Sequence, residues 1–122
     1  MSLRVLLVED DAWLATLQAE ILQGAGFEVV LAPHATSAVV KIDESLPDVV
    51  VADMLLTGTT ALALLHELQS HSDTKDIPVI LCTNLADSVR LDELRPYGVR
   101  RIIDKTTMHP DDLVAAIRSV TE

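Results

Sequence analysis

The sequence Arg4-Val-Leu-Leu-Val-Glu-Asp-Asp11 places a short, continuous apolar run directly before three acidic residues. Such a run of β-branched residues and leucine is typical of a strand that is buried on both faces. Val49-Val-Val-Ala-Asp53 repeats the pattern, and further strands are predicted at 27–31, 78–82 and 101–103. Between the strands the apolar residues follow a helical period, which predicts helices over 12–22, 36–45, 59–70 and 87–94 and from Pro110 onward.

Five strands that alternate with five helices predict an α/β fold. Parallel strands need crossover connections, so a parallel sheet carries helices on both faces. The chain has 122 residues, and we expect residues 1–122 to form a single domain. We expect Thr36 to cap the second helix, Thr59 or Thr60 to begin the third, and Leu17 to face the core from the first.

The composition limits the classes of partner. Nine Lys and Arg stand against 19 Asp and Glu, for a formal net charge of -10. This balance disfavours direct binding to nucleic acid or to an anionic membrane surface, since both need clustered positive charge. The longest uncharged stretch, Met54 to Leu65, is shorter than the roughly 20 residues of a membrane-spanning helix. A single cysteine, Cys82, cannot form an internal disulfide, and we expect a cytoplasmic protein.

Polar and charged side chains follow the predicted strands where a ligand is expected. In an open α/β sheet, ligands bind beyond the carboxyl ends of the strands. There the sequence places the following residues: Glu9, Asp10, Asp53, Thr83 and Lys105. A cluster of carboxylate oxygens suits Mg²⁺. A carboxylate beside this ion, a lysine and a hydroxyl is equipped for phosphoryl transfer, with Asp53 as the attacking group.

Several other polar residues have simpler interpretations. Asp11 is expected to cap the first helix, and Asp104 to be a solvated loop charge. Cys82 is expected to be a small buried apolar residue, and Trp13 to be half exposed beside the site. The histidines are expected to lie on the surface, at positions 34, 66, 71 and 109.

Four motifs resemble the receiver domain of two-component response regulators. They are Val8-Glu9-Asp10-Asp11, Val51-Ala52-Asp53, Leu81-Cys82-Thr83 and Asp104-Lys105. The resemblance covers the whole chain, and it implies a doubly wound, flavodoxin-like parallel sheet with five strands in the order 2-1-3-4-5. It also implies a signalling domain that catalyses its own phosphorylation and dephosphorylation only.

The resemblance implies a role for each site residue. Asp53 would accept a phosphoryl group from a histidine kinase or a phosphotransfer protein. Glu9, Asp10 and Asp53 would hold Mg²⁺ together with the backbone carbonyl of Leu55. Thr83 would be the switch hydroxyl, and Lys105 the partner of the phosphate. Further partners are an output domain or downstream protein and a second copy of the chain. We expect such contacts on the face of the last two helices and the fifth strand, which carries Arg90, Arg95, Arg100, Arg101 and Arg118.

Four departures from the family pattern keep a second hypothesis open. Thr57 replaces a proline, Asn84 a small residue, Ile102 an aromatic residue, and Thr106 the cis proline that follows the lysine. A non-proline cis bond costs ~3 kcal/mol, so we expect a trans peptide that aims Lys105 differently. These departures favour a pseudo-receiver, which is a protein-binding module independent of phosphate.

Two other classes fit less well. A flavin-binding protein of this topology would need a phosphate loop rich in Ser, Thr and Gly after the first strand, where three acids stand instead. A phosphatase resembling the haloacid dehalogenase family would carry a second Asp two positions after Asp53, but Leu55 occupies that position. We therefore disfavour both classes.

Overall fold

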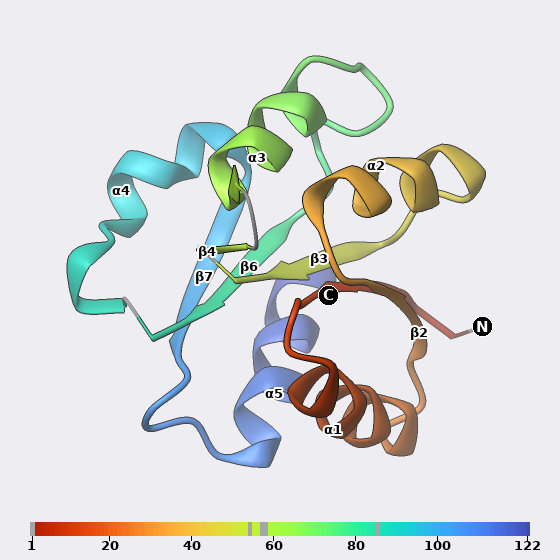
Figure 1. Ribbon diagram of the computed structural model, residues 1–122, viewed down its shortest axis with the longest axis vertical. Coiled ribbons are helices and arrows are strands. Elements are labelled where there is room, and N and C mark those ends of the chain that lie inside the picture. Colours follow the sequence, from red (N-terminus) through yellow and green to blue (C-terminus); the bar gives the residue numbers. More distant parts are fainter. Residues whose placement is uncertain (1, 54, 57–58, 85) are drawn as a thin grey trace.

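A computed structural model describes residues 2–53, 55–56, 59–84 and 86–122. Its main sheet contains five parallel strands in the order β2-β1-β3-β6-β7 (Figure 1). Their bounds are β1 (Arg4–Val8), β2 (Glu28–Ala32), β3 (Val49–Ala52), β6 (Val79–Thr83) and β7 (Val99–Asp104). Counted along the chain, this is the predicted order 2-1-3-4-5, so the doubly wound α/β fold is confirmed.

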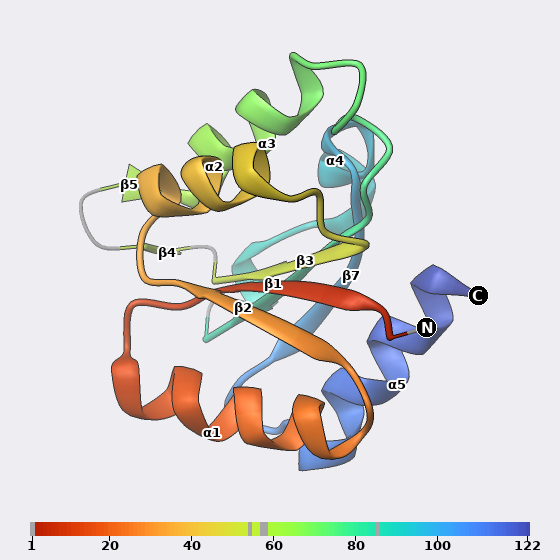
Figure 2. The ribbon, with the colours of Figure 1, turned by 90° about the vertical axis from the view of Figure 1, so that its right-hand side faces the viewer.

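Helices cover both faces of the sheet. Figure 2 shows α1 (Ala12–Gly24) and α5 (Pro110–Thr121) on one face. The other face carries α2 (Ala35–Glu44), α3 (Ala61–Gln69) and the single turn of α4 (Leu91–Leu94). Each face has its own buried apolar cluster, one built around Leu6, Leu65 and Leu81 and the other around Leu7, Ile80 and Ile117. Because both faces are buried, the central strands β1, β3 and β6 carry apolar residues at nearly every position, and this explains their continuous runs.

The first helix packs on the sheet with a different face from the one predicted. Its buried residues are Ala15, Gln18, Ala19 and Leu22. Leu17 is 40% exposed, so the prediction that it faces the core is wrong. The buried face of the helix therefore runs through Ala15, Ala19 and Leu22, and Leu17 lies on the outer side. Trp13, in the first turn, is 74% exposed, more than predicted.

Two helices begin at different residues from those predicted. Helix α2 begins at Ala35 with His34 as its N-cap, and the Ser37 hydroxyl accepts a hydrogen bond from the His34 amide at 3.1 Å. Thr36 is therefore inside the helix and does not cap it. Helix α3 begins at Ala61, because the preceding Thr59–Thr60 forms strand β5, which pairs antiparallel with β4 (Leu55–Leu56).

The segment before the last strand is broken where one helix was predicted. It forms a 3₁₀ turn (Ala86–Ser88), the short helix α4 and a second 3₁₀ turn (Arg95–Tyr97). Pro96 and Gly98 end it, and Gly98 has a φ of 93°, which favours glycine. Strand β7 follows and is longer than predicted.

The last helix begins at Pro110, as predicted. Asp112 in its first turn accepts a hydrogen bond from the His109 amide at 2.8 Å. Across the described ranges, no helix is both long and apolar enough to cross a membrane.

Candidate functional site

A lysine from the last strand joins two carboxylates from other strands. Lys105 Nζ lies 2.6 Å from Glu9 Oε2 and 2.7 Å from Asp53 Oδ2. Glu9 follows β1, Asp53 follows β3 and Lys105 follows β7, so the three meet at the carboxyl edge of the sheet. All three side chains are largely buried, with 4% of Glu9, 14% of Asp53 and 9% of Lys105 exposed. Little water screens these charges, so their interaction is stronger than that of an exposed ion pair.

Burial and pairing act on both members of this ion pair. Burial raises the pKa of Glu9, and the hydrogen bond and charge of Lys105 offset only part of that rise. For Lys105, burial works against the charged form. Hydrogen bonds to Asp53 and Glu9 and the charges of both outweigh it, so the pKa of the ammonium is raised. Lys105 is therefore a cation fixed between two acids at neutral pH.

The two residues after Glu9 lead into the first helix. Asp11 caps α1, as predicted, because its Oδ1 accepts a hydrogen bond from the Leu14 amide at 3.1 Å. The amide of Asp11 in turn donates to Glu9 Oε1 at 3.2 Å, which fixes the second oxygen of that carboxylate. Asp10 lies between them and is partly exposed.

A surface hollow of about 380 Å³ opens onto these carboxylates. Its lining contains the following residues: Glu9, Asp10, Asp11, Leu14, Asp53, Asn84, Lys105 and Met108. Thr83 ends β6 and is 1% exposed, whereas the next residue, Asn84, is exposed and lines the hollow. Asn84 therefore borders the space beside Asp53, where the family pattern has a small residue.

The loop after β7 has the expected trans peptide but differs from the expectations for Lys105 and Asp104. No peptide bond in the described segments is cis, as expected for a lysine followed by threonine. Lys105 nevertheless points at Asp53, so the expectation that it is aimed differently is wrong. Asp104 is more than a solvated charge, because its Oδ1 accepts hydrogen bonds from the Thr106 amide at 2.8 Å and the Thr106 hydroxyl at 2.6 Å.

The carboxylate oxygens at this edge suit a hard divalent cation, although they provide only some of the ligands that such an ion needs. In the part of the chain that is described, no three His, Cys, Asp or Glu side chains form a ready metal centre. The acidic residues offer oxygen atoms only, and Mg²⁺ is usually bound by one or two carboxylates with waters completing its shell. Lys105 already contacts Glu9 and Asp53, so a cation there would share these carboxylates with the ammonium.

Three other residues singled out from the sequence have fewer described contacts. Leu55 belongs to β4, close in the chain to Asp53. Thr57 lies outside the described residues. Ile102 is half-buried and packs against the core cluster of Leu6, Leu65 and Leu81. Leu14 and Met108 line the hollow and were missed, because neither carries a chemical group that sequence reasoning selects.

The remaining minor expectations hold. All four histidines are exposed, as predicted. Cys82 is 2% exposed, as predicted for a small buried residue. Burial raises the pKa of its thiol to about 11.

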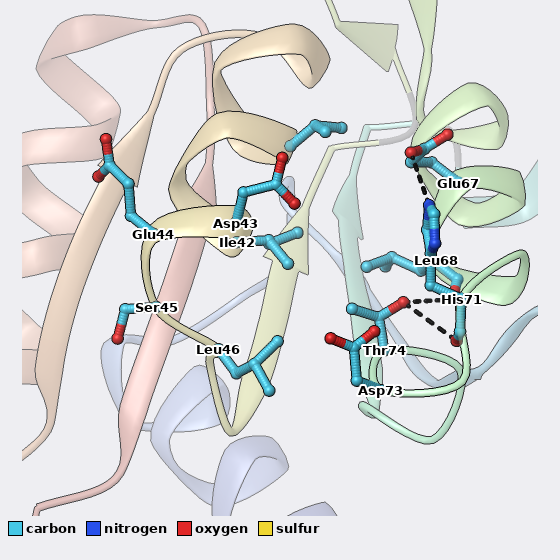
Figure 3. A pocket seen from close by; sticks show the side chains of 11 residues that line it. Ile42, Asp43, Glu44, Ser45, Leu46, Glu67, Leu68, His71, Asp73 and Thr74 are labelled. Carbon is cyan, nitrogen blue, oxygen red and sulfur yellow. Dashed lines mark hydrogen bonds and ion pairs between the residues drawn. The ribbon is translucent and has the colours of Figure 1, made fainter.

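A second hollow, of about 300 Å³, lies between α2 and α3 (Figure 3). Exposed acids surround it, including Asp43, Glu44, Glu67 and Asp73. Buried Thr74 donates to the Leu68 carbonyl at 2.6 Å. The lining residues come from the carboxyl-terminal parts of both helices and the segments after them, not from the strand ends that carry Asp53 and Lys105.

Comparison with known proteins points to one family. The family described as response regulator receiver domain matches residues 5–118. The phosphate regulon transcriptional regulatory protein PhoB of Escherichia coli is 32% identical over 98% of this chain and 52% of its own length. The DNA-binding response regulator MtrA of Mycobacterium tuberculosis is 30% identical over 98% of this chain and 50% of its own length. The chain thus spans about half the length of these relatives.

Solved structures agree with this match. The chemotaxis response regulator CheY4 of Vibrio cholerae has a TM-score of 0.88 at 22% identity, covering 98% of this chain and 99% of its own. At that identity it shows the fold alone. The signal receiver domain of a signal transduction histidine kinase from Syntrophus aciditrophicus has a TM-score of 0.85 at 25% identity, covering 98% and 90%.

Proposed function

The chain belongs to the response regulator receiver domain family, and from this premise we propose that Asp53 accepts a phosphoryl group from a histidine kinase or a phosphotransfer protein. One observation carries the proposal: the Lys105 ammonium lies 2.7 Å from Asp53 at the open carboxyl edge of the sheet. A carboxylate held beside a buried cation and open to a hollow is placed to receive an anionic group.

The proposed phosphoryl transfer is a single displacement at phosphorus. A carboxylate oxygen of Asp53 attacks the phosphorus of a phosphoimidazole. The bond from phosphorus to the imidazole nitrogen breaks, and the histidine keeps that electron pair and takes up a proton. Lys105 contacts the carboxylate and provides positive charge near the transferring oxygens. We propose that the Thr83 hydroxyl donates a hydrogen bond to the phosphoryl group.

The metal part of the proposal rests on donor chemistry. We propose that Asp10, Asp53, Glu9 and the Leu55 carbonyl hold Mg²⁺. When bound, this ion would neutralise negative charge on the acids and on the incoming phosphoryl group. The Asp11 amide fixes one oxygen of Glu9, and Lys105 fixes the other.

The names of the curated relatives suggest how such a signal is used. PhoB is named as a transcriptional regulatory protein and MtrA as a DNA-binding response regulator. We propose that this chain supplies the phosphorylation-dependent input to an output domain or a separate protein. Direct contact with nucleic acid is not part of the proposal, because the formal net charge of this chain is -10.

The second candidate is a pseudo-receiver that binds a protein independently of phosphate. Asn84 favours it, because this exposed side chain lines the hollow beside Asp53. Under this hypothesis the ion pair of Lys105 with Asp53 is a permanent structural link and Asp53 is never modified.

Intact-mass measurement separates the two candidates. The chain is incubated with acetyl phosphate, with and without Mg²⁺, as wild type, Asp53→Asn and Asp43→Asn. Asp43 is an exposed acid on α2 and serves as the matched control. We expect one phosphoryl group on the wild type and on Asp43→Asn, only with Mg²⁺, and none on Asp53→Asn. Folded wild type that gains no mass would favour the pseudo-receiver.

A further inference from the structure

The residues on either side of Lys105, Asp104 and Thr106, are joined by hydrogen bonds that close a turn around it. Asp104 Oδ1 accepts hydrogen bonds from both the amide and the hydroxyl of Thr106, at 2.8 and 2.6 Å. The Thr107 amide also donates to the Asp104 carbonyl, at 3.3 Å. Lys105 lies inside this turn, and its own amide donates to the Thr83 carbonyl of β6 at 3.1 Å. We call the Asp104–Thr106 pair the clip.

The Lys105 side chain must cross two or three strand positions to contact the two acids. It follows β7, which lies at the edge of the sheet, while Asp53 follows β3 two strands away and Glu9 follows β1 three strands away. Neighbouring strands are about 4.8 Å apart, so these separations are about 10 and about 14 Å. A lysine side chain is a flexible stem that holds no direction by itself. The direction of the backbone at Lys105, whose amide donates to the Thr83 carbonyl of β6, therefore decides whether the ammonium contacts both acids.

The hydrogen bonds of the clip belong neither to a helix cap nor to the ion pairs of the Lys105 ammonium. Asp104 does not cap a helix, since α5 begins only at Pro110. The ammonium of Lys105 bonds to Glu9 and Asp53. Donation from the Thr106 hydroxyl and amide lowers the pKa of the Asp104 carboxyl, so the acceptor stays ionised at neutral pH. Charge-assisted hydrogen bonds of this kind are stronger than neutral ones.

We propose that Asp104 and Thr106 are positioning residues, which orient the backbone so that Lys105 reaches the phosphoryl acceptor. This inference rests on the proposed phosphorylation of Asp53. It gives Thr106 a positive role at a position where the family pattern has a proline. In this chain hydrogen bonds restrict the turn, and a proline ring is not required.

The test compares variants that remove one atom group each. Thr106→Val removes the hydroxyl and keeps the shape, Thr106→Ser restores the hydroxyl, and Asp104→Ala removes the acceptor, whereas Asp104→Asn keeps an acceptor oxygen. Thr107→Val is the matched control, since its side chain is exposed and one residue further on. Circular dichroism checks that each variant is folded.

The first measurement does not depend on phosphorylation. In uniformly ¹⁵N-labelled protein, an ammonium held in an ion pair gives a resolved ¹H–¹⁵N signal, which Lys105→Met identifies. We expect this signal to be lost or broadened in Thr106→Val and Asp104→Ala. It should persist in Thr106→Ser, Asp104→Asn and Thr107→Val. A signal that persists in all the variants overturns the inference, whether or not Asp53 is phosphorylated.

The second measurement is the rate of phosphorylation at increasing acetyl phosphate. We expect Thr106→Val and Asp104→Ala to lower the maximal rate about tenfold, because a misplaced group costs far more in the transition state than in binding. The donor concentration at half-maximal rate should change little, and Thr106→Ser should restore the rate. Unchanged rates despite a lost ammonium signal overturn the positioning role. A wild type that takes no phosphoryl group instead refutes the proposed function, and the ammonium signal then decides whether the clip positions Lys105.

Discussion

Acidic side chains surround two hollows of this molecule, yet the two regions differ in how the acids are held. At the carboxyl edge of the sheet, Glu9 and Asp53 are largely buried and share the Lys105 ammonium. Between α2 and α3, the acids around the hollow in Figure 3 are exposed. The polar contacts in this region, the ion pair of Lys41 with Glu44 at 3.9 Å and the hydrogen bond between His71 Nε2 and Glu67 Oε1 at 3.1 Å, are open to water. Exposed pairs of this kind contribute little. Burial and pairing, rather than a hollow or a count of acids, therefore distinguish the candidate site.

The comparison is tested most strongly by removing a lysine from each region. Lys105→Met should lower the rate of phosphorylation by acetyl phosphate by about 100- to 1000-fold, the range for losing one preorganised electrostatic group. Lys41→Met, which removes the exposed lysine beside Glu44, should leave the rate unchanged. The measurement is phosphoryl incorporation followed by intact mass. Equal rates in the two variants would show that the buried ion pair has no part in the transfer.

Cys82 gives a second test of how burial acts on an ionisable group, because burial disfavours its charged thiolate. Burial raises its pKa to about 11 from 9.0, so at pH 8 the folded thiol should react with iodoacetamide about 100-fold more slowly than a free cysteine. As the only cysteine in the chain, it gives a clean mass count. The same protein unfolded in urea is the control. Fast labelling of the folded chain would contradict the burial described for β6.

The carboxylates that face the site hollow should differ from other acids in metal binding. Trp13 is 74% exposed and lies two residues after the cap Asp11, so its fluorescence is a reporter for this edge. We expect Mg²⁺ to change the emission in a saturable manner. Asp10→Asn should weaken the apparent affinity about 10- to 100-fold, whereas Asp43→Asn on α2 should not. An equal response in the two variants would mean that the ion binds diffusely to the acidic surface.

The smallest effect concerns stability. The pKa of Glu9 is raised in the folded protein, so its contribution is favourable below pH 4.5 and is lost as the pH rises above that value. Glu9→Gln lacks this loss and should be more stable than wild type at pH 7. The difference should vanish near pH 4. Urea unfolding followed by circular dichroism measures it, with Glu44→Gln as the exposed control. A difference that is the same at every pH would contradict the assignment to Glu9.

The central strands of the sheet were predictable because they carry an apolar signal at nearly every position. Val5 to Val8 and Val49 to Ala52 are apolar without interruption, and both runs are strands with closely matching bounds. Site residues at strand ends were predictable for the same reason, since Glu9 and Asp53 directly follow these runs.

Helical details were less predictable because several helices depend on contacts beyond the local sequence. Leu17 fits an inward face by spacing, but the buried face of α1 runs through Ala15, Ala19 and Leu22. One helix was predicted over 87–94, but only Leu91–Leu94 is α-helical, with a 3₁₀ turn on either side. The strand ends predict that Glu9 and Lys105 lie at one edge, but not their direct contact, which spans 96 positions.

This separation has a consequence for the order in which the protein is made. Strands β1 and β3 leave the ribosome long before residue 105 is synthesised, so Glu9 and Asp53 first lie close together without their cation. During that interval the acids repel each other, and the central strands can associate only against this repulsion. Docking of the last strand brings in the ammonium, which offsets part of this negative charge. The complete ion-pair site therefore forms only in the final stage of folding, after the last strand has docked.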